Sequence, residues 1–110
     1  MGECFRLEFR DSVFALVGEL DIASVDSFET QVATRLNDVA SVVALDLSEL
    51  SFVDATGLSS FVKLERQLRD GHRVLVLRNP RPNVQRALDV TGLTSLLERS
   101  VEDGGRKLST

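Results

Sequence analysis

The 110-residue chain is poor in the side chains that most often carry catalysis or bind metal ions. It has one cysteine, Cys4, so no disulfide can form within the chain. Cys4 and the lone histidine, His72, are too few for a standard zinc site. A Ser-His-Asp arrangement would also require His72, which lies in an Asp-Gly-His-Arg stretch typical of a turn. We therefore expect a protein that is not an enzyme and that holds no metal ion or cofactor.

The lack of a long apolar run and of excess basic charge limits the partners and the cellular location that we expect. No apolar run approaches the roughly 20 residues of a membrane span, and the first ten residues lack the long apolar stretch of a signal peptide. Acidic residues outnumber basic ones, 17 to 13, for a net charge of −4. Proteins that bind nucleic acids or anionic membranes carry an excess of basic residues instead. We expect a cytoplasmic protein with no nucleic-acid partner and no membrane insertion.

What is present is ordinary for a globular domain. The chain is 43% hydrophobic and 27% charged, and its length fits one folding unit. We predict a single domain over residues 1–110, with its core in residues 5–100 and a polar tail at 101–110.

Hydrophobic periodicity predicts the order of the elements. Residues 5–10 alternate between apolar and polar, and residues 13–17 are continuously apolar, which together predict an antiparallel hairpin. Residues 42–47 and 74–77 predict two further strands. Apolar spacing of three and four predicts helices over residues 25–37, 58–70 and 82–89, with Ser24 capping the first through its hydroxyl. The segment 93–97 fits either a strand or a helix.

This order, β-β-α-β-α-β-α, predicts an α/β fold with a mixed sheet of four to five strands. In open sheets of this kind, ligands and partners meet the loops at the carboxyl ends of the parallel strands. These loops are predicted at residues 18–24, 48–57 and 78–82.

The most informative stretch places a hydroxyl residue, Thr56, between Asp54 and Gly57 at the start of a helix. One interpretation is that Asp54 or Thr56 is simply the N-cap. Gly57 favours a functional role for this turn in addition to capping, because glycine costs up to about 1 kcal/mol relative to alanine within a helix. An exposed glycine would leave Thr56 approachable by another protein, as a modification site requires.

Three motifs in this sequence resemble the STAS domain family, in particular its anti-sigma factor antagonists. The first is Gly-Glu-Leu-Asp at residues 18–21, and the second is Asp-Leu-Ser at residues 46–48 followed by Phe-Val-Asp-Ala-Thr-Gly-Leu at 52–58. The third comprises residues 84–88 and Val-Thr-Gly-Leu at 90–93. The resemblance covers roughly residues 5–100.

The resemblance implies a regulator of transcription in a stress response. It implies that the unphosphorylated protein binds an anti-sigma factor that is also a serine/threonine kinase of the GHKL ATPase type, and thereby releases a sigma factor. Phosphorylation of the matching acceptor, Thr56, would end binding, and a phosphatase would restore it. The predicted partner-binding residues are Asp21, Ser24, Asp54, Ala55, Gly57, Leu58, Ser59 and Ser60.

Two alternatives share the same fold. The chain could be a STAS subunit of an ABC-type lipid-transport ATPase, in which Thr56 would be a packing contact. It could also be a module that senses a small ligand or nucleotide through the strand-end loops. Neighbouring genes for a sigma factor or for a transporter would separate the first two interpretations, and calorimetry against nucleotides would test the third.

Overall fold

The order of strands and helices follows the sequence prediction. The computed structural model describes residues 5–39 and 41–97, so the predictions for Cys4 and for the tail at 101–110 lie outside the described residues. The elements are β1 (Phe5–Arg10), β2 (Val13–Leu20), α1 (Val25–Arg35), β3 (Val42–Val53), α2 (Ala55–Asp70), β4 (Val74–Arg78) and α3 (Pro82–Thr91), with 3₁₀ helices at Leu36–Asp38 and Leu93–Leu96. The predicted β-β-α-β-α-β-α order and the α/β fold class are confirmed.

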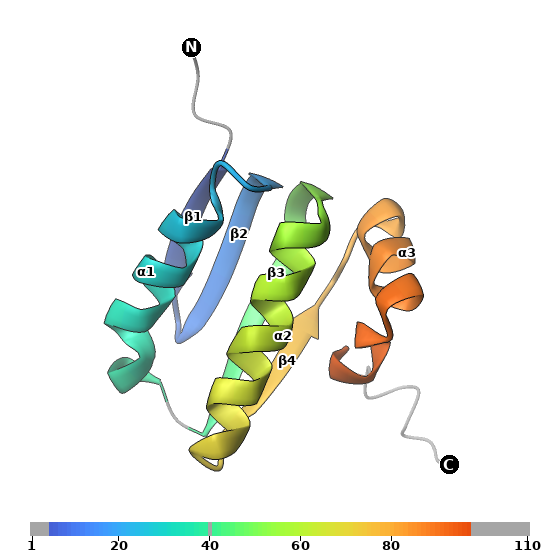
Figure 1. The fold of residues 1–110 in the computed structure, drawn as a ribbon. Coiled ribbons are helices and arrows are strands. Elements are labelled where there is room, and N and C mark those ends of the chain that lie inside the picture. The colour runs from blue at the N-terminus through green and yellow to red at the C-terminus, as the bar shows by residue number, and fades with distance from the viewer. Residues whose placement is uncertain (1–4, 40, 98–110) are drawn as a thin grey trace.

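The four strands form one mixed sheet in the order β1-β2-β3-β4 (Figure 1). Strand β1 pairs with β2 in antiparallel orientation, which confirms the predicted hairpin, and β2–β3 and β3–β4 are parallel. The hairpin turns at Asp11 and Ser12, whose φ angles of 54° and 65° are both positive. Two positive φ angles in a two-residue loop are the geometry whose twist suits a tight hairpin.

Helices α1 and α2 lie side by side on one face of the sheet (Figure 1). Alternate residues of β2 and β3 point toward them, so Phe14, Leu16 and Leu45 are fully buried. Phe28 of α1 and Phe61 of α2 are buried against each other, with ring centroids 5.8 Å apart and the planes 75° from parallel. This edge-to-face contact fixes the two helices to each other above the sheet.

Strand β3 is longer than the sequence indicates. We expected a strand over residues 42–47 and a loop from residue 48, but β3 continues to Val53 because it keeps pairing with β2, up to Leu20 opposite Val53. Beyond Asp46 it has passed the end of β4. In this part of β3, side chains bond the backbone carbonyls that β4 does not reach. Arg81 Nε donates to the Ser48 carbonyl at 2.9 Å, and Asn83 Nδ2 donates to the Ser51 carbonyl at 2.8 Å.

Residues 93–97, for which the sequence allowed either a strand or a helix, contain a short helix followed by a strand-like pairing. Gly92 ends α3 in the left-handed conformation, with φ at 78°, and a short 3₁₀ helix follows over Leu93–Leu96. Leu97 then pairs with Leu77 of β4 through one isolated parallel bridge. This bridge lies on the outer side of β4.

Candidate functional site

Two strand-end loops come together beside the start of α2. Leu20 and Val53, the last residues of β2 and β3, are register partners, so the loops that follow them leave the same edge of the sheet. The backbone N–H of Asp54 donates to the carbonyl of Leu20 at 3.1 Å, which ties the two loops to each other. The third predicted loop, residues 78–82, instead sends Arg81 to the β3 backbone.

The Thr56 hydroxyl is held by the carboxylate of Asp54. Thr56 Oγ1 donates to Asp54 Oδ1 at 2.5 Å, and the same oxygen accepts the backbone N–H of Gly57 at 3.0 Å. Asp54 is therefore the N-cap of α2. Thr56 is half-buried, and its hydrogen bond to Asp54 is partly buried as well.

These hydrogen bonds lower the pKa of Asp54. The largest cause is the hydroxyl of Thr56, and the backbone N–H groups of Gly57, Ile22 and Thr56 act in the same direction, against an opposing contribution from desolvation. Each of these donors stabilises the ionised form of the carboxyl. Asp54 thus stands beside Thr56 as a carboxylate at neutral pH, and its link to Ile22 joins it to the β2–α1 loop.

The β2–α1 loop is stiffened by Ser24, although not by the bond that we predicted. Ser24 occupies the N-cap position of α1, yet its side chain makes no bond to a helix N–H. Its hydroxyl instead donates to the carbonyl of Glu19 at 3.0 Å and accepts the N–H of Asp21 at 3.0 Å. The prediction of a side-chain cap was wrong because these loop groups take the hydrogen bonds of the buried hydroxyl.

The expectation that Gly57 is exposed was also wrong. Gly57 is buried, and a Cβ built on it would lie 2.6 Å from Val53 Cγ2 and 2.9 Å from the carbonyl oxygen of Leu20. Glycine is needed at this position because the first turn of α2 packs directly on the ends of β2 and β3. Thr56 is accessible because of its own position on the helix and not because of a gap at Gly57.

The structure divides the predicted partner-binding residues into two groups. Exposed or half-buried are Asp21, Asp54, Ala55 and Ser59, whereas Ser24, Gly57, Leu58 and Ser60 are buried. The buried group shapes the site from within and presents little side chain to a partner. Ile22 belongs to the loop at residues 18–24, which was predicted to meet partners, but it was not among the eight residues named from the sequence; it is 74% exposed. Its signal was a single large apolar residue within an otherwise polar loop.

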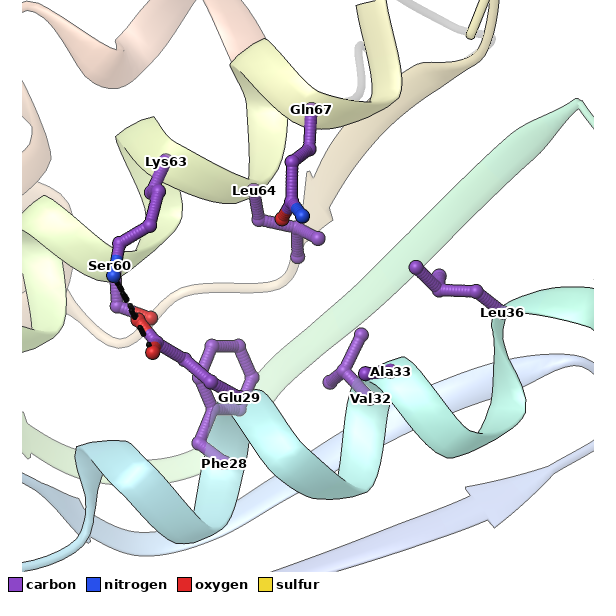
Figure 2. Close-up of a pocket in the computed structure, with 9 residues that line it drawn as sticks. All are labelled: Phe28, Glu29, Val32, Ala33, Leu36, Ser60, Lys63, Leu64 and Gln67. Carbon is purple, nitrogen blue, oxygen red and sulfur yellow. Dashed lines mark hydrogen bonds and ion pairs between the residues drawn. The ribbon is translucent and has the colours of Figure 1, made fainter.

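A groove between α1 and α2 continues from this site along the two helices. Near Thr56 it is a hollow of about 270 Å³ lined by residues that include Asp26, Glu29 and Lys63. Farther along, a second hollow of about 300 Å³ has an apolar floor that includes Phe28 (Figure 2). The ion pair between Lys63 Nζ and Glu29 Oε2, at 3.2 Å, spans the groove where the two hollows meet.

Residues 5–39 and 41–97 hold neither a cluster of metal-ligating side chains nor a membrane-spanning helix. No three His, Cys, Asp or Glu side chains in these ranges gather closely enough to hold a metal ion. Nor do these ranges contain a helix with the length and apolarity to cross a bilayer.

Comparison with known proteins identifies the family. The model of the STAS domain matches residues 5–104. The anti-sigma-B factor antagonist of Listeria monocytogenes is 29% identical over 83 residues, which are 76% of this chain and 73% of that protein. The anti-sigma factor antagonist SpoIIAA in its unphosphorylated form superimposes with a TM-score of 0.73 at 25% identity, over 89% of each chain. The phosphorylated form of the Bacillus cell fate determinant SpoIIAA gives 0.64 at 22% identity, over 89% of this chain and 92% of that one. The chain belongs to the STAS domain family.

Proposed function

We propose that this protein is an anti-sigma factor antagonist, a regulatory binding protein rather than an enzyme, whose binding is switched off by phosphorylation of Thr56. The observation that carries the proposal is the Thr56 hydroxyl, presented beside Asp54 where two strand-end loops meet. Relatives and structural neighbours named as anti-sigma factor antagonists support the class of function. In this proposal the partner is an anti-sigma factor with GHKL-type kinase activity, and a phosphatase reverses the modification.

The binding surface in this proposal is centred on Thr56. It comprises the exposed Ile22, the half-buried Asp21 and Asp54, and Ala55 and Ser59 on the exposed side of the first turns of α2. An apolar side chain surrounded by polar and acidic groups fits the usual make-up of a transient protein interface. Ile22 is the member of this set that can enter a pocket on the partner.

The chemistry of the switch is a phosphoryl transfer. Thr56 Oγ1 attacks the γ-phosphorus of ATP and forms the new P–O bond. The bond from this phosphorus to the β–γ bridging oxygen breaks, ADP leaves with the electron pair, and the hydroxyl proton passes to water. Asp54 accepts the hydrogen bond of that hydroxyl and so fixes its direction. Because the pKa of Asp54 is lowered, the carboxylate is a weak base and its contribution is mainly orientation.

Phosphorylation then changes the site electrostatically. The ester oxygen can no longer donate to Asp54, and a charge of about −1.5 to −2 appears beside a carboxylate. A helix N-terminus tolerates this charge, so the fold is retained. Against an acidic group of the partner about 6 Å away, at an effective dielectric near 20, the repulsion is about 3 kcal/mol for each pair of unit charges. This amounts to roughly a hundredfold loss of affinity.

The test measures binding of the purified protein to a candidate anti-sigma factor by calorimetry. Thr56→Ala is expected to bind like wild type, and Thr56→Glu to bind at least tenfold more weakly. Ser41→Glu is the matched control, because Ser41 is exposed at the opposite end of β3 and adds the same charge away from the site. Equal binding by wild type and Thr56→Glu, or phosphosite mapping that finds the phosphoryl group elsewhere, would contradict the proposed switch.

A further inference from the structure

Three residues of α2 form a line that leads away from the Thr56 hydroxyl. Thr56, Ser60 and Lys63 are spaced by four and three residues, which places them on one face of the helix. This face looks toward α1, and all three line the same hollow of about 270 Å³ together with Asp26 and Glu29. Thr56 therefore borders the same hollow as Ser60 and Lys63.

Ser60 is the unusual member of this line. It is only 2% exposed, and its hydroxyl oxygen has no hydrogen-bond partner among the residues that the structure describes. A buried hydroxyl without a partner carries the cost of its desolvation and gains nothing in return. The hydroxyl oxygen itself is closed off from solvent. Because Ser60 lines the hollow, rotation about its Cα–Cβ bond would turn the hydroxyl toward an oxygen atom that enters from the side of Thr56.

Lys63 provides a positive charge at the hollow beside Thr56. Among the residues that line this hollow it is the one cation, and its ammonium group is held by Glu29 at 3.2 Å. Figure 2 shows the Lys63 side chain extending from α2 to Glu29 of α1. The Cα atoms of Thr56 and Lys63 are about 10.5 Å apart along the helix axis. A four-carbon stem that leans toward the helix N-terminus shortens this gap.

We propose that the groove between α1 and α2 receives the phosphate of phosphorylated Thr56, with Lys63 leaving Glu29 to pair with the phosphate and Ser60 donating a hydrogen bond to it. This inference rests on the proposed phosphorylation of Thr56. The exchange is favourable because the phosphate carries a charge of about −1.5 to −2 and offers three acceptor oxygens, against a single charge on Glu29.

The exchange has a structural consequence for the α1 side of the groove. The Lys63–Glu29 pair is an ion pair between α1 and α2, and it is given up when Lys63 turns to the phosphate. Glu29 then stands as a free carboxylate beside the phosphorylated site. The modification thus alters the surface of both helices, and not only the residue that bears it.

The experiment uses protein in which phosphothreonine is incorporated at position 56 during synthesis, so that no kinase is required. ³¹P NMR across pH 4–8 gives the second pKa of the phosphate. The charged groups that face the phosphate are Asp21 from the β2–α1 loop, Asp54, Asp26 and Glu29 from α1, and Lys63. Because the four carboxylates raise this pKa and Lys63 lowers it, each variant is compared with wild type.

In Lys63→Gln the acid dissociation constant of the phosphate is expected to fall about two- to fivefold, the range for an exposed ion pair. Glu29→Gln frees Lys63 and removes a carboxylate, so the constant is expected to rise above that of wild type. The matched control is Arg66→Gln, an exposed cation of the same helix that does not line the hollow. It is expected to change the constant by less than a factor of 1.5.

Three results would overturn the inference. The first is an acid dissociation constant of the phosphate that is the same in wild type and Lys63→Gln. The second is a change in this constant that is the same in Lys63→Gln and Arg66→Gln. The third is a constant in Ser60→Ala that equals that of wild type. The proposed function is judged separately, by anti-sigma factor binding to the same phosphorylated wild-type protein. Loss of that binding with unchanged titrations rejects the groove alone, and shifted titrations with undiminished binding reject the switch alone.

Discussion

Replacing Gly57 by alanine tests whether the start of α2 is pressed against the strand ends. In an ordinary helix the change would stabilise the protein, because alanine is favoured over glycine by about 1 kcal/mol. Here the new methyl group would lie 2.6 Å from Val53 Cγ2 and 2.9 Å from the Leu20 carbonyl oxygen. The backbone carbonyl cannot move away freely, because it also accepts the N–H of Asp54 at 3.1 Å.

The magnitude follows from these contacts. Overpacking of this kind costs about 1–3 kcal/mol, and weakening the bond between Asp54 and Leu20 adds about 1 kcal/mol. After the gain in helix propensity is subtracted, Gly57→Ala is expected to lower the free energy of unfolding by about 1–3 kcal/mol. For a domain of this size, each kcal/mol lowers the melting temperature by about 4–8 °C.

The assay is urea unfolding followed by far-ultraviolet circular dichroism, since the chain has no tryptophan or tyrosine to report by fluorescence. Gly71→Ala is the matched control: the contact of its Cβ with the Leu68 carbonyl, at 3.6 Å, is ordinary, and Gly71 has a negative φ of −96°. This variant is expected to be as stable as wild type or slightly more so. Equal stability of the two variants would refute the reasoning.

Three further predictions concern the cap, the loop and the core. Asp54→Asn removes the carboxylate whose pKa is lowered in the folded state. In wild type, the ionised carboxylate stabilises the fold above the unfolded pKa of about 3.9, and this stabilisation is lost as the pH falls through the folded pKa. In acid-unfolding curves, the stability of the variant should therefore depend less on pH below about pH 4. Ser24→Ala removes the hydroxyl that accepts the N–H of Asp21 and is expected to cost about 1–3 kcal/mol in urea unfolding; stability equal to wild type would contradict this. Phe61→Ala empties a fully buried position and is expected to cost about 3–5 kcal/mol by the same assay; a loss below 1 kcal/mol would mean that the core collapses around the gap.

The regular parts of the fold were predictable because their hydrophobic periods are clean. The alternation of β1 and the apolar run of β2 gave the hairpin, and the spacing of three and four gave α1 and α2. The second half of β3 was not predictable. Ser48, Glu49 and Ser51 resemble loop residues, and the register shifts in its pairing with β2 break the alternation that would identify a strand.

At the candidate site, the sequence placed Thr56 beside Asp54, and the structure joins them by a hydrogen bond, but the expected exposure of Gly57 was wrong. The hydrogen bond between them is local, since the residues are two apart, and a cap before a helix is visible in sequence. The tight packing of Gly57 depends on Leu20, which is distant in the chain. The burial of Ser60 depends in the same way on how closely α1 approaches α2, and no local pattern records that distance.

The two edges of the sheet, at β1 and β4, determine how readily this chain can pair with another copy. An open strand edge invites pairing with another chain, and this sheet treats its two sides differently. Beside β4 the edge is occupied by Leu97, and where β3 runs past β4 the side chains of Arg81 and Asn83 occupy its carbonyls. The edge of β1 has no strand beside it among the described residues, and there Arg6, Glu8 and Arg10 alternate as linked charges. A strand that added at this edge would have to fit that charge pattern, so β1 resists indiscriminate aggregation, while the opposite edge is covered in part.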